Sequence, residues 1–167
     1  SKISLSHTGD KVTIQAGKSR YTLATLPAKD FPENDQLAIV ERIKVPEAAL
    51  KELIERTAFA MAQQDVRYYL NGLLFDLKGK TLRCVSTDGH RLALCETELH
   101  ESVENRKQII MPRKGVLELQ RLLEDGDGEI VLEVGNNHLR VSRSDVTFST
   151  KLIEGKFPDY EAVIPIG

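Results

Sequence analysis

The sequence predicts an α+β fold in which two helices pack on curved antiparallel sheets. Hydrophobic and polar residues alternate in many short segments bounded by Gly, Asn and Asp, which is typical of β-strands and hairpin turns. Two other segments carry apolar residues at helical spacing, each directly after a proline. With 167 residues, of which 41% are hydrophobic, the chain is long enough to bury a core without metal or disulfide crosslinks.

The first half of the main module is expected to contain one strand, one helix and three more strands. The strand covers 37–45, and Pro46 then begins the helix. Six residues at helical spacing predict a buried stripe that continues up to the polar residues 63–65: Leu50, Leu53, Ile54, Thr57, Ala58 and Met61. The three strands lie at 71–78, 81–87 and 90–98, with turns at 78–80 and 88–89.

The second half repeats this order of elements. A polar loop at 99–107 precedes a short strand at 108–111, and Pro112 begins the second helix. Its inward residues are predicted to be Val116, Leu119, Leu122 and Leu123. Glycines at 126–128 end the helix, and three final strands follow. The module therefore has an internal pseudo-symmetry, with strand, helix and three strands occurring twice.

A longer repeat relates the start of the chain to its last strands. Residues 1–26 align without gaps to 128–153, and one residue is dropped before the shared Phe-Pro at 31–32 and 157–158. The matched pairs are Ile3 with Ile130, Leu5 with Leu132, Val12 with Leu139, Ile14 with Val141, Tyr21 with Phe148, Leu26 with Ile153, and Phe31-Pro32 with Phe157-Pro158. We therefore expect residues 1–32 to be the last part of one module, cut from a longer tandem array.

Several classes of function are disfavoured by composition. The formal net charge is −2, from 23 basic and 25 acidic residues, so bulk charge does not point to nucleic acid. The four histidines fall in separate segments and no Cys-x-x-Cys occurs, so neither a metal site nor a cofactor is expected. Cys84 and Cys95 lie on neighbouring predicted strands as buried free thiols, with a redox pair as the alternative. No long apolar run or secretory leader is seen, and we expect a reducing cytoplasm.

The best candidate for catalysis is the segment from Ser86 to Arg91. Ser86, Asp88 and His90 are close in sequence, but they lie across a tight turn, and strand alternation scatters their directions. A catalytic triad needs these groups in one hydrogen-bonded line. A plain turn or a binding surface is therefore favoured over a hydrolase.

Two other clusters suggest binding. Arg67 and two tyrosines lie in the segment 63–72, and these residue types are enriched at interfaces and suit sugar-phosphate contacts. The alternative is that one tyrosine only fills the core under the loop. Arg113 and Lys114 lie in the first turn of a helix, where cations oppose the helix dipole. A bound phosphate would explain them, and a solvated pair of surface charges is the alternative.

Four ordered motifs resemble the bacterial DNA polymerase III beta subunit, the replicative sliding clamp family. They are AMAQQDVRYYLNGLLF (60–75), STDGHRLAL (86–94), MPRKGVLEL (111–119) and FSTKLIEGKFPDY (148–160). Residues 17–32 are similar to the end of the family's first domain. The resemblance implies a DNA-clamp fold in a chain of three repeated domains, with two chains forming a homodimeric ring around duplex DNA.

The resemblance also implies a division of the chain and a function without catalysis. Residues 1–35 would be the closing strands of a truncated first domain, 36–162 a complete second domain, and 163–167 the start of the link to a third. The protein would be a cytoplasmic, nucleoid-associated processivity factor, a non-catalytic subunit of the DNA polymerase holoenzyme. A binding module of similar fold that does not bind DNA is the alternative.

Two sets of site residues follow from the resemblance. The DNA-facing positions would be Gln64, Arg67, Tyr69, Arg113 and Lys114. One wall of a groove for linear peptides of polymerases, the clamp loader and repair proteins would be Leu70, Thr87, Gly89, His90, Arg91, Leu92, Pro158 and Val163. Many relatives have arginine where this chain has Ala162, so a peptide contact at that position is not expected here. The net charge would then average a basic inner face with an acidic outer face that includes Glu96, Glu98, Glu101 and Glu133.

Overall fold

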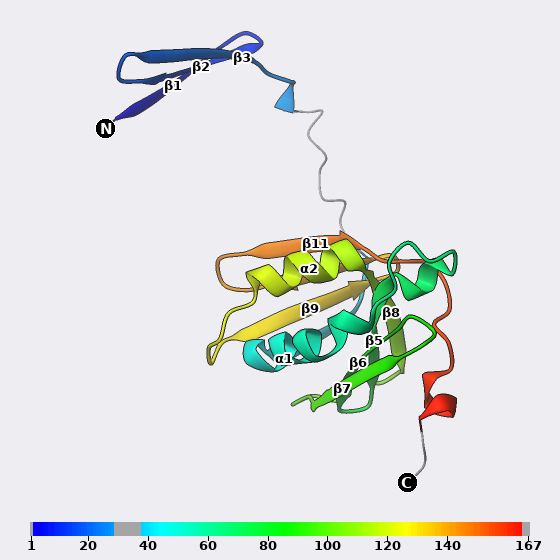
Figure 1. Cartoon of the computed structure of the whole chain (residues 1–167). Coiled ribbons are helices and arrows are strands. Elements are labelled where there is room, and N and C mark those ends of the chain that lie inside the picture. Colours follow the sequence, from blue (N-terminus) through cyan, green and yellow to red (C-terminus); the bar gives the residue numbers. More distant parts are fainter. Residues whose placement is uncertain (1, 29–37, 165–167) are drawn as a thin grey trace. The chain divides into compact units, whose positions relative to one another are not determined.

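The computed structural model describes residues 2–28 and 38–164, which divide into two compact units, 1–36 and 37–167. The first unit is an antiparallel meander of three strands in the order β1-β2-β3 (Figure 1). Its strands are β1 (Ile3–Thr8), β2 (Lys11–Ala16) and β3 (Ser19–Ala24). No helix covers this sheet within the described part of the unit, and its apolar side chains are largely exposed.

The second unit contains the predicted order of strand, helix and three strands twice. The first half comprises β4 (Ile39–Pro46), α1 (Glu47–Thr57), the 3₁₀ turns η2 (Ala58–Ala60) and η3 (Tyr68–Leu70), β5 (Gly72–Lys78), β6 (Thr81–Thr87) and β7 (Leu92–Glu98). The second half comprises β8 (Lys107–Pro112), α2 (Arg113–Leu122), β9 (Glu129–Gly135), β10 (His138–Ser142), β11 (Thr147–Lys151) and the 3₁₀ turn η4 (Tyr160–Val163). The α+β prediction with internal pseudo-symmetry is confirmed.

The two halves exchange strands, so that neither sheet belongs to one half alone. One sheet has the order β11-β10-β9-β4 and the other β7-β6-β5-β8, with antiparallel pairing throughout. Strand β4 of the first half thus pairs with β9, and β8 of the second half pairs with β5. A bridge between Ile110 and Ile153 connects the sheets. Helices α1 and α2 lie side by side and cover the sheets from one side (Figure 1).

Both helices begin and end differently from the prediction. Pro46 and Pro112 have extended backbone, with ψ of 132° and 147°, so each is the last residue of a strand and the cap of the following helix. Helix α1 ends at Thr57, and the buried Met61 is extended, with ψ of 139°. The predicted helix to Met61 was therefore wrong in length, although its stripe is buried. The spacing misled because the 3₁₀ turn η2 keeps the chain on the same face of the core.

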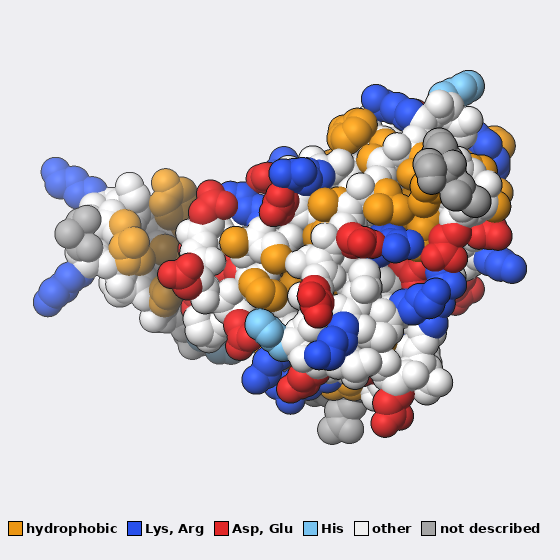
Figure 2. All heavy atoms as spheres, turned by 90° about the horizontal axis from the view of Figure 1, so that it is seen from below, with side chains coloured by type: hydrophobic (Ala, Val, Ile, Leu, Met, Phe, Trp, Pro, Cys, Tyr) orange, Lys and Arg blue, Asp and Glu red, His pale blue; other side chains and the backbone are white. Residues whose placement is uncertain are grey.

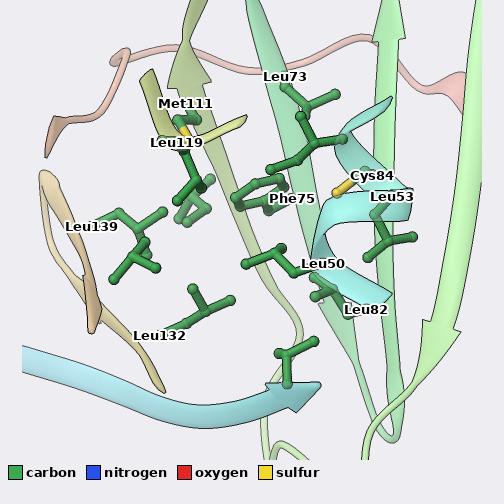
Figure 3. Packing of buried hydrophobic residues seen from close by; sticks show 14 of the residues in the cluster. Leu50, Leu53, Leu73, Phe75, Leu82, Cys84, Met111, Leu119, Leu132 and Leu139 are labelled. Atoms are coloured by element: carbon green, nitrogen blue, oxygen red, sulfur yellow. The ribbon is translucent and has the colours of Figure 1, made fainter. Parts of the chain in front are cut away.

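The main core lies between the helices and the inner faces of both sheets (Figure 3). Side chains from α1, α2 and the two sheets meet there, including Leu50, Leu53, Leu73, Phe75, Leu82, Cys84, Met111, Leu119, Leu132 and Leu139. Full burial of one such aliphatic or aromatic side chain contributes roughly 1.5–3 kcal/mol. The core therefore fixes the sheet whose opposite face carries the candidate site.

A smaller apolar cluster covers that opposite, outer face of the sheet β7-β6-β5-β8. Side chains alternate along a strand, so Leu74 points to the side opposite from its neighbours Leu73 and Phe75. The cluster consists of Ala62, Leu70, Leu74, Val85, Ile110, Phe157 and Tyr160. It brings the C-terminal segment, residues 152–164, onto the sheet beside the loop that follows α1.

The predicted repeat between the first and last strands is confirmed in register. Leu5 faces Ile14 across β1 and β2, and Leu132 faces Val141 across β9 and β10. The next pairs also correspond: Ile14 with Tyr21, and Val141 with Phe148. Each meander ends with an equivalent backbone hydrogen bond: Thr25 to Asp10 at 2.7 Å and Leu152 to Asn137 at 2.8 Å. The predicted match of Phe31-Pro32 lies outside the described residues.

Candidate functional site

An open groove of about 440 Å³ lies on the second unit, between the loop after α1, the turn between β6 and β7, and the C-terminal segment. Its lining consists of Arg67, Leu70, Thr87, Gly89, His90, Arg91, Leu92, Pro158, Asp159, Tyr160 and Val163. All eight residues predicted to form a groove wall line this one hollow. Segments almost 100 residues apart in the sequence therefore meet at a single site.

The floor of the groove is apolar and belongs to the outer cluster. Leu70 and Tyr160 are buried members of that cluster, and Leu92 packs against it half-buried. The exposed Val163 and Pro158 contribute further apolar surface at the C-terminal side. A concave apolar floor of this kind suits hydrophobic side chains of a ligand.

The turn between β6 and β7 is organised by Asp88. Its carboxylate accepts hydrogen bonds from the backbone amides of His90 and Arg91 at 2.9 and 3.0 Å, and from Arg91 Nε at 3.1 Å. The hydrogen bonds from the backbone amides of His90 and Arg91 lower the pKa of Asp88, so the carboxylate stays ionised. Thr87 Oγ1 donates to the Arg91 carbonyl at 2.7 Å and accepts from the Gly89 amide. These bonds fix the wall at this edge of the groove.

Arg91 is held over an exposed aromatic ring. Its guanidinium lies 5.4 Å from the ring centroid of Phe59 and donates to the Phe59 carbonyl at 2.9 Å. On the other side of the turn, Gly89 has a φ of +87°, and an added Cβ would lie 3.0 Å from Arg67 Nη1. The positive φ favours glycine at this position, and a Cβ there would also press on the Arg67 guanidinium.

The loop after α1 is closed by Asn71, a residue that the sequence did not single out. The Asn71 side chain accepts from the Asp65 amide and donates to the Asp65 carbonyl, both at 2.9 Å. Within this closed loop, Gln64 is exposed and adopts a φ of +53°, which is uncommon for a residue other than glycine. Tyr69 is half-buried against the outer cluster, with its ring edge-to-face with Tyr68 at 5.7 Å.

Arg67 belongs to the groove and is already paired. It donates to Asp65 from Nε at 3.0 Å and from Nη2 at 2.8 Å, and it lines the groove beside Gly89. The side-chain hydrogen bonds from Arg67, together with a bond from its amide, lower the pKa of Asp65 to about 2. The guanidinium therefore keeps its counter-ion throughout the neutral range.

Arg113 and Lys114 lie at the N-terminus of α2, close to the same loop. The Arg113 amide donates to the Asn71 carbonyl at 3.0 Å, which joins the helix N-terminus to the end of the loop. Lys114 is exposed and Arg113 half-buried. Within residues 2–28 and 38–164, neither takes part in an ion pair. Their charges are thus available to an external anion.

The acidic residues expected on an outer face are mostly paired or scattered. Glu96 binds Arg83 at 2.7 Å, and Glu133 binds Arg140 at 3.3 Å, while Glu98 and Glu101 are exposed. Figure 2 shows acidic and basic side chains interspersed on the face that it draws. On the face that Figure 2 draws, neither sign of charge therefore forms a continuous patch.

The catalytic alternative has no supporting geometry. The buried Ser86 hydroxyl donates to the Thr57 carbonyl, and Asp88 is occupied by backbone amides of its own turn. Ser86 therefore does not form a line with Asp88 and His90.

Neither a disulfide nor a metal site is formed by the residues that the structure describes. Cys84 and Cys95 face each other across β6 and β7 as free thiols, and burial raises the pKa of Cys84. The described residues contain no cluster of three or more potential metal ligands. In the same residues, no helix has the length and apolar character needed to cross a membrane.

Three groove residues were missed by sequence reasoning: Arg67, Asp159 and Tyr160. Arg67 was assigned to DNA, and nothing in the sequence pattern indicated that its side chain lies beside Gly89. Asp159 and Tyr160 follow the predicted Pro158 directly, so their place could have been inferred from sequence proximity. Nothing in the local pattern indicated that Tyr160 would turn inward.

Comparison with known proteins identifies relatives for nearly the whole chain. A family model described as the DNA polymerase III beta subunit, central domain, matches residues 44–159. The beta sliding clamp of Pseudomonas aeruginosa is 51% identical over 157 residues, which is 94% of this chain and 43% of the relative. The beta sliding clamp of Escherichia coli K12 is 46% identical over the same shares.

Solved structures agree with these relatives. A crystal structure of the DNA polymerase sliding clamp from Pseudomonas aeruginosa with ligand superimposes with a TM-score of 0.91 at 50% identity, over 99% of this chain and 45% of that one. A clamp from the same organism bound to griselimycin gives a TM-score of 0.90 at 49% identity, with the same shares covered. This chain thus spans less than half the length of the relatives that it matches.

Proposed function

The chain belongs to the DNA polymerase III beta subunit family, and from this membership we propose that it is part of a DNA sliding clamp. The observation that carries the proposal is 51% identity over 94% of the chain to a protein named as a beta sliding clamp. Residues 1–35 would close a first domain, 36–162 form the second, and 163–167 lead toward a third. As part of a homodimeric ring in the cytoplasm, the chain would encircle duplex DNA and perform no catalytic step.

DNA contacts are proposed for the surface around the N-terminus of α2. Arg113 and Lys114 carry charges without a counter-ion in the described residues, and the Arg113 amide ties them to the loop that holds Gln64 and Tyr69. A protein that slides along DNA should contact phosphates rather than base edges, because base contacts would favour particular positions. Arg67 contributes less than predicted, since Asp65 already neutralises its charge.

The groove is proposed to receive linear peptides from polymerases, the clamp loader and repair proteins. Its floor of Leu70, Leu92 and Tyr160 suits apolar anchor residues, and Arg67, His90 and Arg91 place polar groups along its rim. At this rim, Asp88 and the Phe59 carbonyl accept hydrogen bonds from the Arg91 guanidinium and hold it in place. Ala162 lies beside this site without a side chain that could reach a ligand.

A chimera tests the ring function. The matching segment of the Pseudomonas aeruginosa clamp is replaced by this chain, and the chimera is loaded with the clamp loader of that organism onto nicked circular DNA. A closed ring should remain on the circle and be lost when a single cut makes the DNA linear, because its hold is topological. A chimera that stays on linear DNA, or that never loads while the parent clamp does, would contradict the proposal.

Titration with griselimycin tests the groove on the chain itself. We expect binding that is weakened about tenfold or more by Leu70→Ala or Arg91→Ala, because each removes a lining contact. Leu117→Ala is the matched control, because Leu117 is an exposed leucine on α2 outside the groove. Equal affinity in all variants would show that the groove is not the binding site.

A further inference from the structure

A polar row crosses the outer face of the sheet beside the apolar floor of the groove. The pairing register places Gln108, Asp76, Arg83 and Glu96 directly opposite one another on β8, β5, β6 and β7. The neighbouring row on this face holds Ile110, Leu74, Val85 and Leu94 in the same manner. We call the first of these rows the polar ladder. Its order of amide, acid, base and acid gives favourable cross-strand pairs throughout.

Asp76 is the centre of the polar ladder. It is only 3% exposed, and its carboxylate accepts from Arg106 at 3.0 and 2.6 Å, from Gln108 at 3.0 Å and from the Tyr160 hydroxyl at 2.7 Å. The same hydroxyl accepts from Arg83 Nη1 at 3.1 Å. Tyr160 therefore has both its donor and an acceptor position occupied by the ladder.

The C-terminal segment depends on such side-chain contacts. Among the described residues, the hydrogen bond from the Ile153 amide to Ile110 is the last backbone bond that joins this segment to the sheet. Beyond it, Phe157 and Tyr160 are buried in the outer cluster. Glu161 adds ion pairs to Arg83 at 3.3 Å and to Arg106 at 3.5 Å. The wall that contains Pro158 and Val163 is thus held by its own side chains.

Tyr160 connects the ladder to the groove. It lines the groove, and it also lines a separate polar hollow of about 70 Å³ together with Asp76, Lys78, Thr81, Arg83 and Glu161. One side of this residue therefore belongs to the ligand site, while its hydroxyl is fixed by the ladder.

We infer that Asp76 and Arg83 are positioning residues that, through the Tyr160 hydroxyl, set the place of the C-terminal wall of the groove. As far as this concerns a ligand, the inference rests on the proposed peptide groove. Neither Asp76 nor Arg83 lines that groove, so each would affect binding without touching the ligand.

Amide hydrogen exchange without any ligand tests the positioning directly. Tyr160→Phe keeps the ring and removes the hydroxyl, and Asp76→Asn keeps the shape and removes the charge. In both variants we expect exchange across 157–163 to become roughly tenfold faster, the effect of one lost charge-assisted hydrogen bond.

Glu47→Gln is the matched control. Glu47 is 4% exposed, accepts from Arg143 at 3.0 Å and from the Glu124 amide at 2.9 Å, and lines a different hollow that shares no residue with the groove. It should lower the unfolding temperature of the second unit and leave exchange at 157–163 unchanged relative to other surface segments. Unchanged exchange at 157–163 in Tyr160→Phe and Asp76→Asn would overturn the inference.

Griselimycin affinity gives the second readout. Tyr160→Phe and Asp76→Asn should weaken binding several-fold, while Glu47→Gln should not. Faster exchange with unaltered affinity would show that the ladder only stabilises the fold, and it would also overturn the inference. If the unaltered chain binds no griselimycin, the proposed groove fails on this chain, and the exchange result alone then decides whether the ladder positions the wall.

Discussion

The meander β1-β2-β3 and the meander β9-β10-β11 have the same pattern of apolar residues and the same register, yet opposite environments. Leu5 is 70% exposed, whereas its counterpart Leu132 is 1% exposed. The difference does not come from the strands, because their cross-strand pairs correspond one to one. It comes from the helices α1 and α2, which lie over the second meander and have no counterpart in the described part of the first unit.

The comparison separates two pieces of information in one sequence pattern. Alternation specifies strands, turns and register, and it does so in both meanders. Burial requires a second layer, which must come from elsewhere in the chain or from another segment. An apolar face therefore indicates which side of a sheet can be covered by a second layer. It does not indicate whether such a layer is present.

A charge placed on the two faces should give the largest contrast. Leu132→Lys puts an ammonium group into the main core without a partner and should cost about 4 kcal/mol or more, so that the second unit fails to fold. Leu5→Lys at the corresponding exposed position should change the free energy of unfolding by about 0.5 kcal/mol or less. Circular dichroism during chemical denaturation measures both. A loss of folding in Leu5→Lys would show that the first face is covered in solution.

Truncation should give a smaller but graded contrast. Leu139→Ala removes a fully buried side chain from β10 and should lower the free energy of unfolding by about 2–5 kcal/mol. Its counterpart Val12→Ala lies on a half-exposed site in β2 and should cost about 1 kcal/mol or less. Similar losses at the two positions, measured by urea denaturation, would remove the distinction between the meanders.

Most of the fold was accessible from the sequence because it depends on local patterns. The strand order within each half, the helix positions and the repeat register all follow from alternation, helical spacing and turn residues. The pattern could not give the end of α1, because the 3₁₀ turn after Thr57 continues the same buried stripe to Met61. Nor could it give the pairing of β4 with β9, which joins strands about 90 residues apart.

For the candidate site, the sequence motifs predicted the lining residues but not the side chains that hold them in place. The resemblance supplied eight residues, and the structure brings all eight to one groove. The side chains that hold this groove, Asp88, Asn71 and Asp76, were not singled out for that role, because their partners are fixed by tertiary contacts rather than spacing. Arg67 was assigned to DNA, and its pairing with Asp65 became visible only in three dimensions.

The ion pair that joins the second meander to α1 gives the next prediction. Arg143 follows β10, and its guanidinium binds the buried Glu47 at the start of α1. The aligned residue in the first unit is Ala16, whose side chain cannot form such a pair. Arg143→Ala should lower the free energy of unfolding of the second unit by about 3 kcal/mol, because it leaves the Glu47 carboxylate buried without a cation. The double change Arg143→Met with Glu47→Leu should restore most of the loss. An unstable double variant would show that volume and not charge is limiting.

Acid should give the smallest difference in stability between the two units. Burial tends to raise the pKa of Asp76, but hydrogen bonds from Arg106, Tyr160 and Gln108 outweigh it, so the pKa lies below its ordinary value of about 3.9. A lowered pKa means that the stabilisation is fully present above about pH 4 and is lost as the pH falls through the folded-state pKa. The described part of the first unit has no buried carboxylate, so its meander should not share this dependence.

Unfolding of the second unit is measured between about pH 5 and pH 2 in the unaltered chain and in Asp76→Asn. The stability difference between them should narrow over this range, since acid neutralises the carboxylate that the variant already lacks; a constant difference would show that the charge of Asp76 is not what stabilises the ladder.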